Sequence, residues 1–283
     1  MKCVPRTQKE LIKLEAYRLT EHPIVIHLDL DVIIHKPMDD VLDFMMNPKR
    51  YKNSPELLSK IPIMWPEKDI PDDISLLFTK DYNVVAPRRR DKPYQGGFFV
   101  IKPSVKTYNE FVEIVLSGDY NVLKGWGNKV GPFYGGMTIQ GLLPWYYEYV
   151  RPGISVELNR CRYNNMNDNP NIERENFIRC RTNEEECEDC RHTSSDNIFT
   201  FHFTICQKPW HCLRLKKNHT DSALCREMHG KWYELRSELE ASWGRNKIGP
   251  GSYYLDHYKG YCSYFGKKGY QSIQLPYGQP AAE

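Results

Sequence analysis

Two aspartates separated by a single residue, Asp29 and Asp31, are the side chains in this sequence whose type and spacing most directly indicate chemistry. They interrupt an apolar run that extends from Ile24 to Ile34. Two carboxylates that face the same way repel each other and are costly to desolvate unless a cation lies between them. The pattern therefore predicts a divalent metal site at the end of a core strand. The alternative is that the aspartates cap the strand where it reaches solvent.

A second stretch, FHFTICQKPW from Phe201 to Trp210, carries side chains that complement the aspartates. His202 on an expected strand is a candidate third ligand, because a neutral imidazole beside two carboxylates suits manganese, with magnesium as the alternative ion. Lys208, fixed by the proline and tryptophan that follow it, could place a positive charge beside a departing diphosphate. The alternative for His202 is a structural role within its strand.

The elements expected around these residues are those of an α/β fold. The β-branched run around the aspartates predicts a buried strand, from one face of which His27, Asp29 and Asp31 project together. A helix is expected to precede it and to end at Pro23. Further along, periodicity predicts strands at 81–87, 96–104 and 197–204 and helices at 104–118 and 223–242. The stretch 134–150 is expected to form a glycine turn followed by an apolar helix that is broken near Pro144, and 53–73 a proline-rich surface excursion.

Strands that alternate with helices favour an α/β sandwich. One domain is expected over residues 1–242, followed by a Gly, Tyr and Pro-rich tail over 243–283. The formal net charge of +3 in 283 residues is too small to indicate nucleic-acid binding. No apolar run approaches the roughly 20 residues of a transmembrane helix.

The cysteines indicate an oxidising compartment. Seven of the nine lie between Cys161 and Cys225, a density typical of disulfide-bonded segments of the secretory pathway. Disulfides are expected at Cys180, Cys187 and Cys190, and between Cys206 and Cys212. The alternatives are a zinc site formed by Cys180, Cys187, Cys190 and His192, or unlinked thiols. The secretory pathway, with the Golgi lumen as the specific expectation, is favoured over the cytosol.

Four stretches, in order, resemble the glycogenin-type members of glycosyltransferase family 8. They are KLEAYRLTEH with the aspartate strand, YQGGFFVIKPS, GGMTIQGLLPWYY and HFTICQKPW, which together span Lys9 to Trp210. The resemblance implies a GT-A-type fold, in which helices flank a Rossmann-like mixed sheet. It also implies a retaining transferase that uses manganese and a nucleoside-diphosphate sugar such as a UDP-sugar. The acceptor would be a glycan, a protein or a lipid.

The resemblance also assigns roles to individual residues. Asp29 and Asp31 would bind the metal with His202, and Gln140 would lie beneath the reacting sugar carbon. Lys208 would assist the departing diphosphate. The donor would be contacted by Lys13, Gln95, Gly96, Gly97 and Lys208.

Three of the motifs depart from the family pattern. Ile139 stands where the family has an aspartate, Gln95 and Gly96 stand where it has Asn-Ser, and Ile205 replaces a glycine. The family's N-terminal βαβ unit, which binds the base, has no counterpart here, so the chain is expected to be a fragment or a truncated gene product. Two alternatives remain: an inactive relative that binds a glycan or a partner, and a disulfide-rich module that binds a sugar through calcium.

Overall fold

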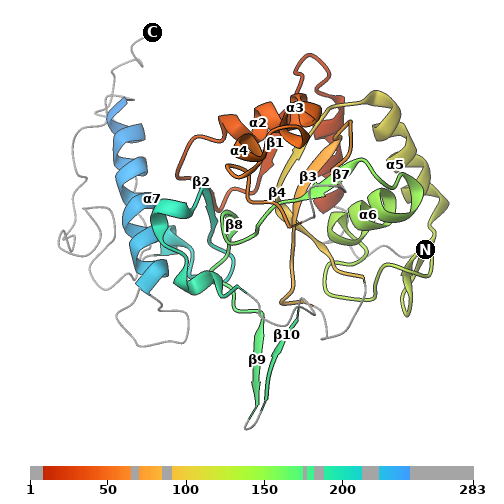
Figure 1. Ribbon diagram of the computed structural model, residues 1–283. Helices are drawn as coiled ribbons and strands as arrows, with labels where there is room; N and C mark the ends of the chain where they lie inside the picture. The colour runs from red at the N-terminus through yellow and green to blue at the C-terminus, as the bar shows by residue number, and fades with distance from the viewer. Residues whose placement is uncertain are drawn as a thin grey trace, which may run out of the picture.

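A computed structural model describes residues 9–64, 70–84, 91–174, 177–181, 188–211 and 223–242 of the chain (Figure 1). It confirms an α/β fold. The central sheet is mixed and four-stranded, in the order β1-β4-β3-β7. Strands β1 (Val25–Leu28), β3 (Leu76–Lys80) and β7 (Ser155–Glu157) are parallel to one another, and β4 (Tyr94–Ile101) is antiparallel to both of its neighbours. The expected tail at 243–283 lies outside the described residues.

Helices cover both faces of this sheet (Figure 1). On one face lie η1 (Lys9–Arg18), α5 (Val105–Ser117), and α6 (Ile139–Trp145), which continues as the π-helical turn η3 (Tyr146–Val150). On the other face lie α2 (Asp39–Met46), α3 (Pro48–Lys52) and α4 (Pro55–Leu58). The sheet thus forms the middle layer of a three-layer sandwich.

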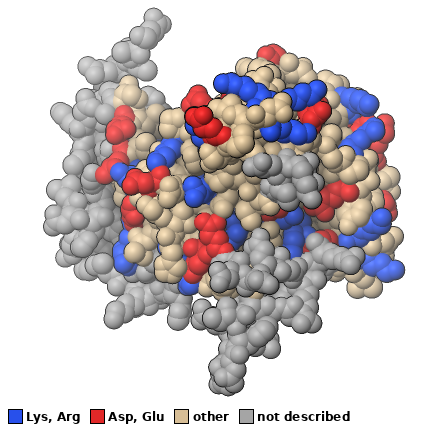
Figure 2. All heavy atoms as spheres, viewed as in Figure 1, with Lys and Arg blue, Asp and Glu red and all other residues tan. Residues whose placement is uncertain are grey.

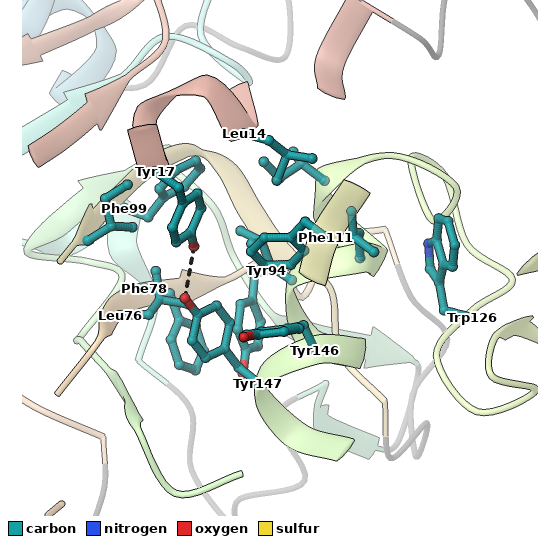
Figure 3. Packing of buried hydrophobic residues seen from close by; sticks show 14 of the residues in the cluster. Leu14, Tyr17, Leu76, Phe78, Tyr94, Phe99, Phe111, Trp126, Tyr146 and Tyr147 are labelled. Atoms are coloured by element: carbon teal, nitrogen blue, oxygen red, sulfur yellow. Dashed lines mark hydrogen bonds between the residues drawn. The ribbon is translucent and has the colours of Figure 1, made fainter. Parts of the chain in front are cut away.

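Alternation along the strands decides which side chain enters which core. In β4, Phe99 and Ile101 pack with the α5–α6 layer, while Phe98 and Val100 pack with the α2–α4 layer. The first core is rich in aromatic rings, and its Tyr17 and Tyr147 hydroxyls are hydrogen-bonded at 3.0 Å (Figure 3). Because both faces of β4 are buried, its second half, Phe98 to Ile101, is a continuous apolar run.

A smaller sheet lies beside the sandwich. Its order is β2 (Val32–Ile34), β11 (Thr200–His202) and β8 (Tyr163–Asn165), with β11 antiparallel to β2 and parallel to β8. Helix α7 (Ala223–Ser242) packs on this sheet through its own apolar cluster. The remaining elements are β5 (Tyr120–Asn121), β6 (Gly125–Trp126), the projecting hairpin β9 (Asn171–Arg174) and β10 (Phe177–Cys180), η4 (Cys190–His192), η5 (Ser195–Asn197) and η6 (Pro209–His211) (Figure 1).

The predicted single strand through Asp29 and Asp31 is wrong. The chain makes two strands, β1 and β2, which belong to different sheets, and the aspartates lie in the turn between them. The N–H of Val32 donates to the carbonyl of Asp29 at 3.1 Å, which closes a four-residue turn. Leu30 at its tip is 99% exposed. The apolar run therefore spans a switch from one sheet to the other.

Two other predictions on element positions need correction. The strand predicted at 81–87 is absent from the described part of that range, and the real strand β3 ends one residue earlier, at Lys80. The expected surface excursion at 53–73 instead contributes Leu58, Ile61 and Ile70 to a core. In the second case tertiary packing outweighs the local signal of the prolines.

The cysteines form disulfides, as expected, but with different partners. Cys161 pairs with Cys190, and Cys206 pairs with Cys225 rather than with Cys212. Cys180 is disulfide-bonded as well, and Cys187 and Cys212 lie outside the described residues. The zinc alternative is wrong, because Cys190 is consumed by its disulfide and cannot ligate a metal as a free thiolate.

The described surface carries charges of both signs. On the face shown in Figure 2, basic and acidic side chains are interspersed, without a broad patch of either sign. Within the described residues, none of the helices combines the length and the apolar character needed to span a bilayer. The disulfides Cys161–Cys190 and Cys206–Cys225 are compatible with an oxidising compartment.

A buried carboxylate gives a prediction on pH-dependent stability. Asp81, 5% exposed, follows β3 directly, and burial, together with the charge of Asp168, raises its pKa to about 6. Between about pH 4 and pH 6 the folded chain binds a proton that the unfolded chain does not, so stability falls as pH rises through this window. Asp81→Asn should therefore flatten this slope and raise the free energy of unfolding at pH 7 by about 1–3 kcal/mol. Urea denaturation of both proteins across this pH window and at pH 7 measures the free energy of unfolding. If stability depends on pH in Asp81→Asn as it does in wild type, the prediction is wrong.

Candidate metal centre

The turn between β1 and β2 presents both aspartates to one side. Its start is tied to the central sheet, since the N–H of Asp29 donates to the carbonyl of Gly97 at 2.9 Å. Its end is tied to the smaller sheet, since the N–H of Phe203 donates to the carbonyl of Asp31 at 2.9 Å. The backbone of the turn is therefore fixed between two sheets, and the carboxylates need little reorganisation to act together.

The histidine from the smaller sheet completes the group. One ligand atom each of Asp29, Asp31 and His202 lies within 4.8 Å of the others. The Nε2 atom of His202 is buried without a hydrogen-bond partner and lies 3.2 Å from Oδ1 of Asp31. A buried imidazole nitrogen left unpaired is costly unless another group, such as a metal ion, engages its lone pair. Two carboxylate oxygens and one imidazole nitrogen fit manganese, and the predicted trio is brought together.

Asn164 sets the tautomer of this histidine. Its Oδ1 faces Nδ1 of His202 at 3.1 Å, and its amide donates to Oγ1 of Thr79 at 2.9 Å and to Oε1 of Gln95 at 3.3 Å. Because the amide nitrogen is occupied as a donor, Oδ1 is the acceptor, so Nδ1 of His202 carries the proton. Nε2 then has a free lone pair directed at the aspartates. Asn164 is fully buried and adopts φ +106°, a strained conformation for a residue with a side chain.

Each aspartate also has a lysine partner. Lys13 from η1 donates to Asp29 at 2.7 Å and to the carbonyl of Gly96 at 3.0 Å, and Lys208 forms an ion pair with Asp31. Burial alone would raise the pKa of Asp31, but the ion pair with Lys208 opposes this effect, and that pKa lies well below its usual range. Burial would likewise raise the pKa of Asp29, but His27 and Lys13 nearby lower it below its usual value. Both carboxylates are therefore charged at neutral pH, as ligation requires.

The aspartates and His202 line a pocket of about 450 Å³. Its walls also contain Glu10, Lys13, Gln95, Gly96, Gly97, Tyr134, Gly135, Thr138, Gln140 and Thr204. All the site residues expected from the sequence thus meet here, with Lys208 joined through its ion pair to Asp31. Gln95 differs from its expected role in one respect: its Oε1 already accepts from the N–H of Gly97. The Gln95 side chain therefore holds the backbone at the floor of the pocket as well as lining it.

Ile139 does not face this pocket. Its side chain is fully buried in the aromatic core, one residue before Gln140. Gly135 lines the pocket instead. Its φ is +76°, and a Cβ added there would lie 2.3 Å from Oε1 of Gln140. The glycine turn therefore leaves room for the Gln140 amide at the start of α6.

Several residues of the site have no signal in the sequence. Asn164 lies in the polar run NNMND, which reads as a loop, and nothing there indicates a buried partner for His202. Tyr134, 85% exposed, stands at the rim of the pocket. His27, by contrast, was expected beside the aspartates; it stacks on Phe99 with ring centroids 4.5 Å apart, and its Nε2 lies 3.7 Å from Asp29.

Removing the Asn164 side chain should weaken the centre without stressing the backbone. Asn164→Gly tolerates the positive φ but frees the His202 ring, so manganese affinity should fall by about 10- to 100-fold, the range for partners behind a ligand. Isothermal titration with manganese measures it. Asn128→Gly is the matched control, because Asn128 also has a positive φ (56°) and is exposed. Equal manganese affinity in wild type and Asn164→Gly would show that Asn164 does not set the tautomer of His202.

Comparison with known proteins does not add to this description: no protein-family model matches the chain, and no curated protein is significantly similar to it. The chemistry of the site therefore has to be inferred from its geometry. Two carboxylates and an imidazole lie at a pocket wall, and two lysines stand beside them. Such an arrangement suits a divalent cation together with a polyanionic ligand such as a diphosphate.

Proposed function

We propose that this chain is a manganese-dependent, retaining glycosyltransferase of the GT-A type. It would transfer a sugar from a nucleoside-diphosphate sugar, with UDP-sugars as the first donors to test, to an acceptor hydroxyl. The observation that carries the proposal is the convergence of Asp29, Asp31 and His202 within 4.8 Å on a pocket that also contains Lys13 and Gln140. A divalent ion with adjacent lysines is the arrangement needed to hold a diphosphate leaving group.

The fold supports the same proposal. The aspartate turn follows a strand of a mixed sheet that has helices on both faces, and it lies where the chain passes from that sheet to a smaller one. Ligands of open α/β sheets bind beyond the carboxyl ends of the strands. The four motifs that resemble glycosyltransferase family 8 meet at this place, since each contributes at least one residue to the pocket.

The residues have distinct tasks in this mechanism. Asp29, Asp31 and His202 would hold manganese, which as a Lewis acid neutralises charge on the diphosphate when bound. Lys208 stands next to Asp31 and can donate to a phosphate oxygen as negative charge grows there. Lys13 lies against the Gly96 carbonyl and can orient the donor sugar or its phosphate. Gln140 presents its amide from the start of α6 and can position the sugar.

The transfer itself conserves atoms and charge without a protein base. The bond between the anomeric carbon and the diphosphate oxygen breaks, and a bond from the acceptor oxygen to the same face of that carbon forms. The acceptor proton passes to the departing phosphate oxygen. The absence of a carboxylate at Ile139, which is buried in the core, is compatible with such a route.

The buried Ile139 also favours a second candidate function. A relative that keeps the metal centre but has lost turnover would bind a nucleoside diphosphate or a glycan without transferring sugar. The two candidates differ in one observable, the release of nucleoside diphosphate from a donor in the presence of manganese. For either candidate, the disulfides Cys161–Cys190 and Cys206–Cys225 favour an oxidising compartment, and we propose the Golgi lumen.

The test uses the 283-residue chain with manganese and a panel of UDP-, GDP- and ADP-sugars. Titration calorimetry should show manganese-dependent but weak binding of UDP, and a coupled assay with a high concentration of the chain should show at most slow UDP release from at least one donor. Both signals should disappear on adding EDTA. Binding without release from any donor would favour the inactive relative. The absence of manganese-dependent diphosphate binding would refute both candidates.

A further inference from the structure

Asn164 owes its orientation toward the metal centre to an irregularity in the smaller sheet. Tyr163 and Asn165, two apart on β8, pair with residues of β11 that are adjacent in the chain, so Asn164 is the extra residue of a β-bulge. Its φ of +106° belongs to the same distortion. A bulge redirects the side chain of its extra residue. The orientation of His202 therefore depends on whatever holds this bulge in place.

The residue after the bulge is fixed between the two halves of a disulfide. The side-chain amide of Asn165, which is fully buried, donates to the carbonyl of Cys161 at 2.8 Å and to that of Cys190 at 3.2 Å. Its Oδ1 accepts from the N–H of Asn167 at 2.7 Å. The Cys161–Cys190 disulfide joins the two residues whose carbonyls accept from Asn165. Any rotation of this side chain would leave buried polar groups unpaired, which is costly.

Other contacts join the same two stretches of chain. Nε of Arg160 donates to Oδ2 of Asp168 at 3.0 Å in a buried ion pair, and the Arg160 guanidinium also donates to the carbonyl of Glu188. The N–H of Cys190 donates to the carbonyl of Asp168 at 3.0 Å. These contacts should keep both stretches folded without the disulfide, so that its removal loosens the bulge rather than unfolding the chain.

We propose that the Cys161–Cys190 disulfide and Asn165 are positioning groups for the metal centre, which hold Asn164 so that the proton of His202 stays on Nδ1. Manganese binding therefore requires the oxidised chain. Both cysteines are 0% exposed, so this dependence is established when the chain folds rather than by later reduction of the folded protein. The effect on manganese rests on the proposed metal centre, whereas the effect on the tautomer does not.

The test removes the disulfide in the double variant Cys161→Ala, Cys190→Ala. Two-bond ¹H–¹⁵N correlation spectra of protein labelled with ¹⁵N-histidine, recorded at pH 8 without metal, report the tautomer of His202, whose signals are identified by their loss in His202→Ala. Wild type should show one tautomer with the proton on Nδ1, and the double variant a mixture of two. Manganese affinity of the double variant, measured by titration calorimetry, should fall by about 10- to 100-fold.

Two further variants separate positioning from stability. Cys206→Ala, Cys225→Ala is the matched control, because it removes another buried disulfide but leaves the bonds of Asn165 intact. Both double variants should melt below wild type, since each loses a cross-link, but the control should keep the single tautomer. Asn165→Ala, which retains the Cys161–Cys190 disulfide, should also give the mixture, and it decides the question if the first double variant does not fold.

Two results would overturn the inference. One is the single wild-type tautomer in folded Cys161→Ala, Cys190→Ala or in Asn165→Ala, and the other is the same mixture in the Cys206→Ala, Cys225→Ala control. If wild type binds manganese while the tautomer is unaffected in the variants, the positioning role fails and the metal centre stands. If the tautomer is lost as expected but wild type does not bind manganese, the positioning role stands and the metal centre, with the proposed function, fails.

Discussion

Asp31→Asn is expected to lower manganese affinity by more than about 100-fold and to abolish manganese-dependent binding of UDP. Loss of a partner behind a ligand already costs about 10- to 100-fold, and Asp31 is itself a proposed ligand. The substitution also leaves Lys208 without its carboxylate and His202 with a neutral neighbour. Titration calorimetry of the two proteins, with manganese alone and with manganese and UDP, measures both effects.

The variant should remain folded. The lowered pKa of Asp31 means that its charge stabilises the fold above the unfolded-state pKa and that this contribution is lost as pH falls through the folded-state pKa. A modest decrease in melting temperature at neutral pH is therefore expected with unchanged circular dichroism. Asp119→Asn, on an exposed residue away from the pocket, is the control. Wild-type manganese affinity in folded Asp31→Asn would remove Asp31 from the ligand set.

Gly97→Ala is expected to disrupt the same centre through a steric clash. An added Cβ would lie 2.3 Å from Cε1 of His202 and 2.9 Å from Oε1 of Gln95, too close for either contact. The imidazole cannot yield easily because its Nδ1, which would lie 2.8 Å from the added Cβ, is hydrogen-bonded to Asn164. The ring must therefore shift, so manganese affinity should fall by about 100-fold and the fold should lose about 1–3 kcal/mol from overpacking.

Gly230→Ala separates this clash from a general effect of glycine replacement. Gly230 lies inside α7, and nothing is within 4 Å of an added Cβ, so alanine should stabilise the helix by up to about 1 kcal/mol. Manganese affinity should not change in that variant. If Gly97→Ala binds manganese as tightly as wild type, then His202 is not held in the position described above.

The sequence predicted the parts of the site that local chemistry encodes. The aspartate pair, His202 and Lys208 carry charge or ligating atoms in recognisable strings, and the resemblance of the order of these strings to that of a known family predicted that they would meet. Elements with strong periodicity, such as α5 and α7, were also predicted correctly. Such features depend on residue type and spacing within short segments, which is what a sequence displays.

Features that depend on contacts between distant segments were not predictable. The division of the aspartate run into β1 and β2 depends on hydrogen bonds to Gly97 and Phe203, which lie far along the chain. The disulfide partner of Cys206 is Cys225 because α7 folds back onto the smaller sheet, a choice that cysteine spacing does not determine. Asn164 gives no signal because its importance lies in one tertiary hydrogen bond.

Crystals of the chain soaked with manganese, with anomalous diffraction data collected near the manganese absorption edge, test the metal centre most directly. We expect one strong anomalous peak about 2.0–2.4 Å from a carboxylate oxygen of Asp29, a carboxylate oxygen of Asp31 and Nε2 of His202. The same crystals of Asp31→Asn should show no peak there. A peak bound to other residues, or wild-type crystals without a peak between these three side chains, would contradict the proposed metal centre and with it the proposed function.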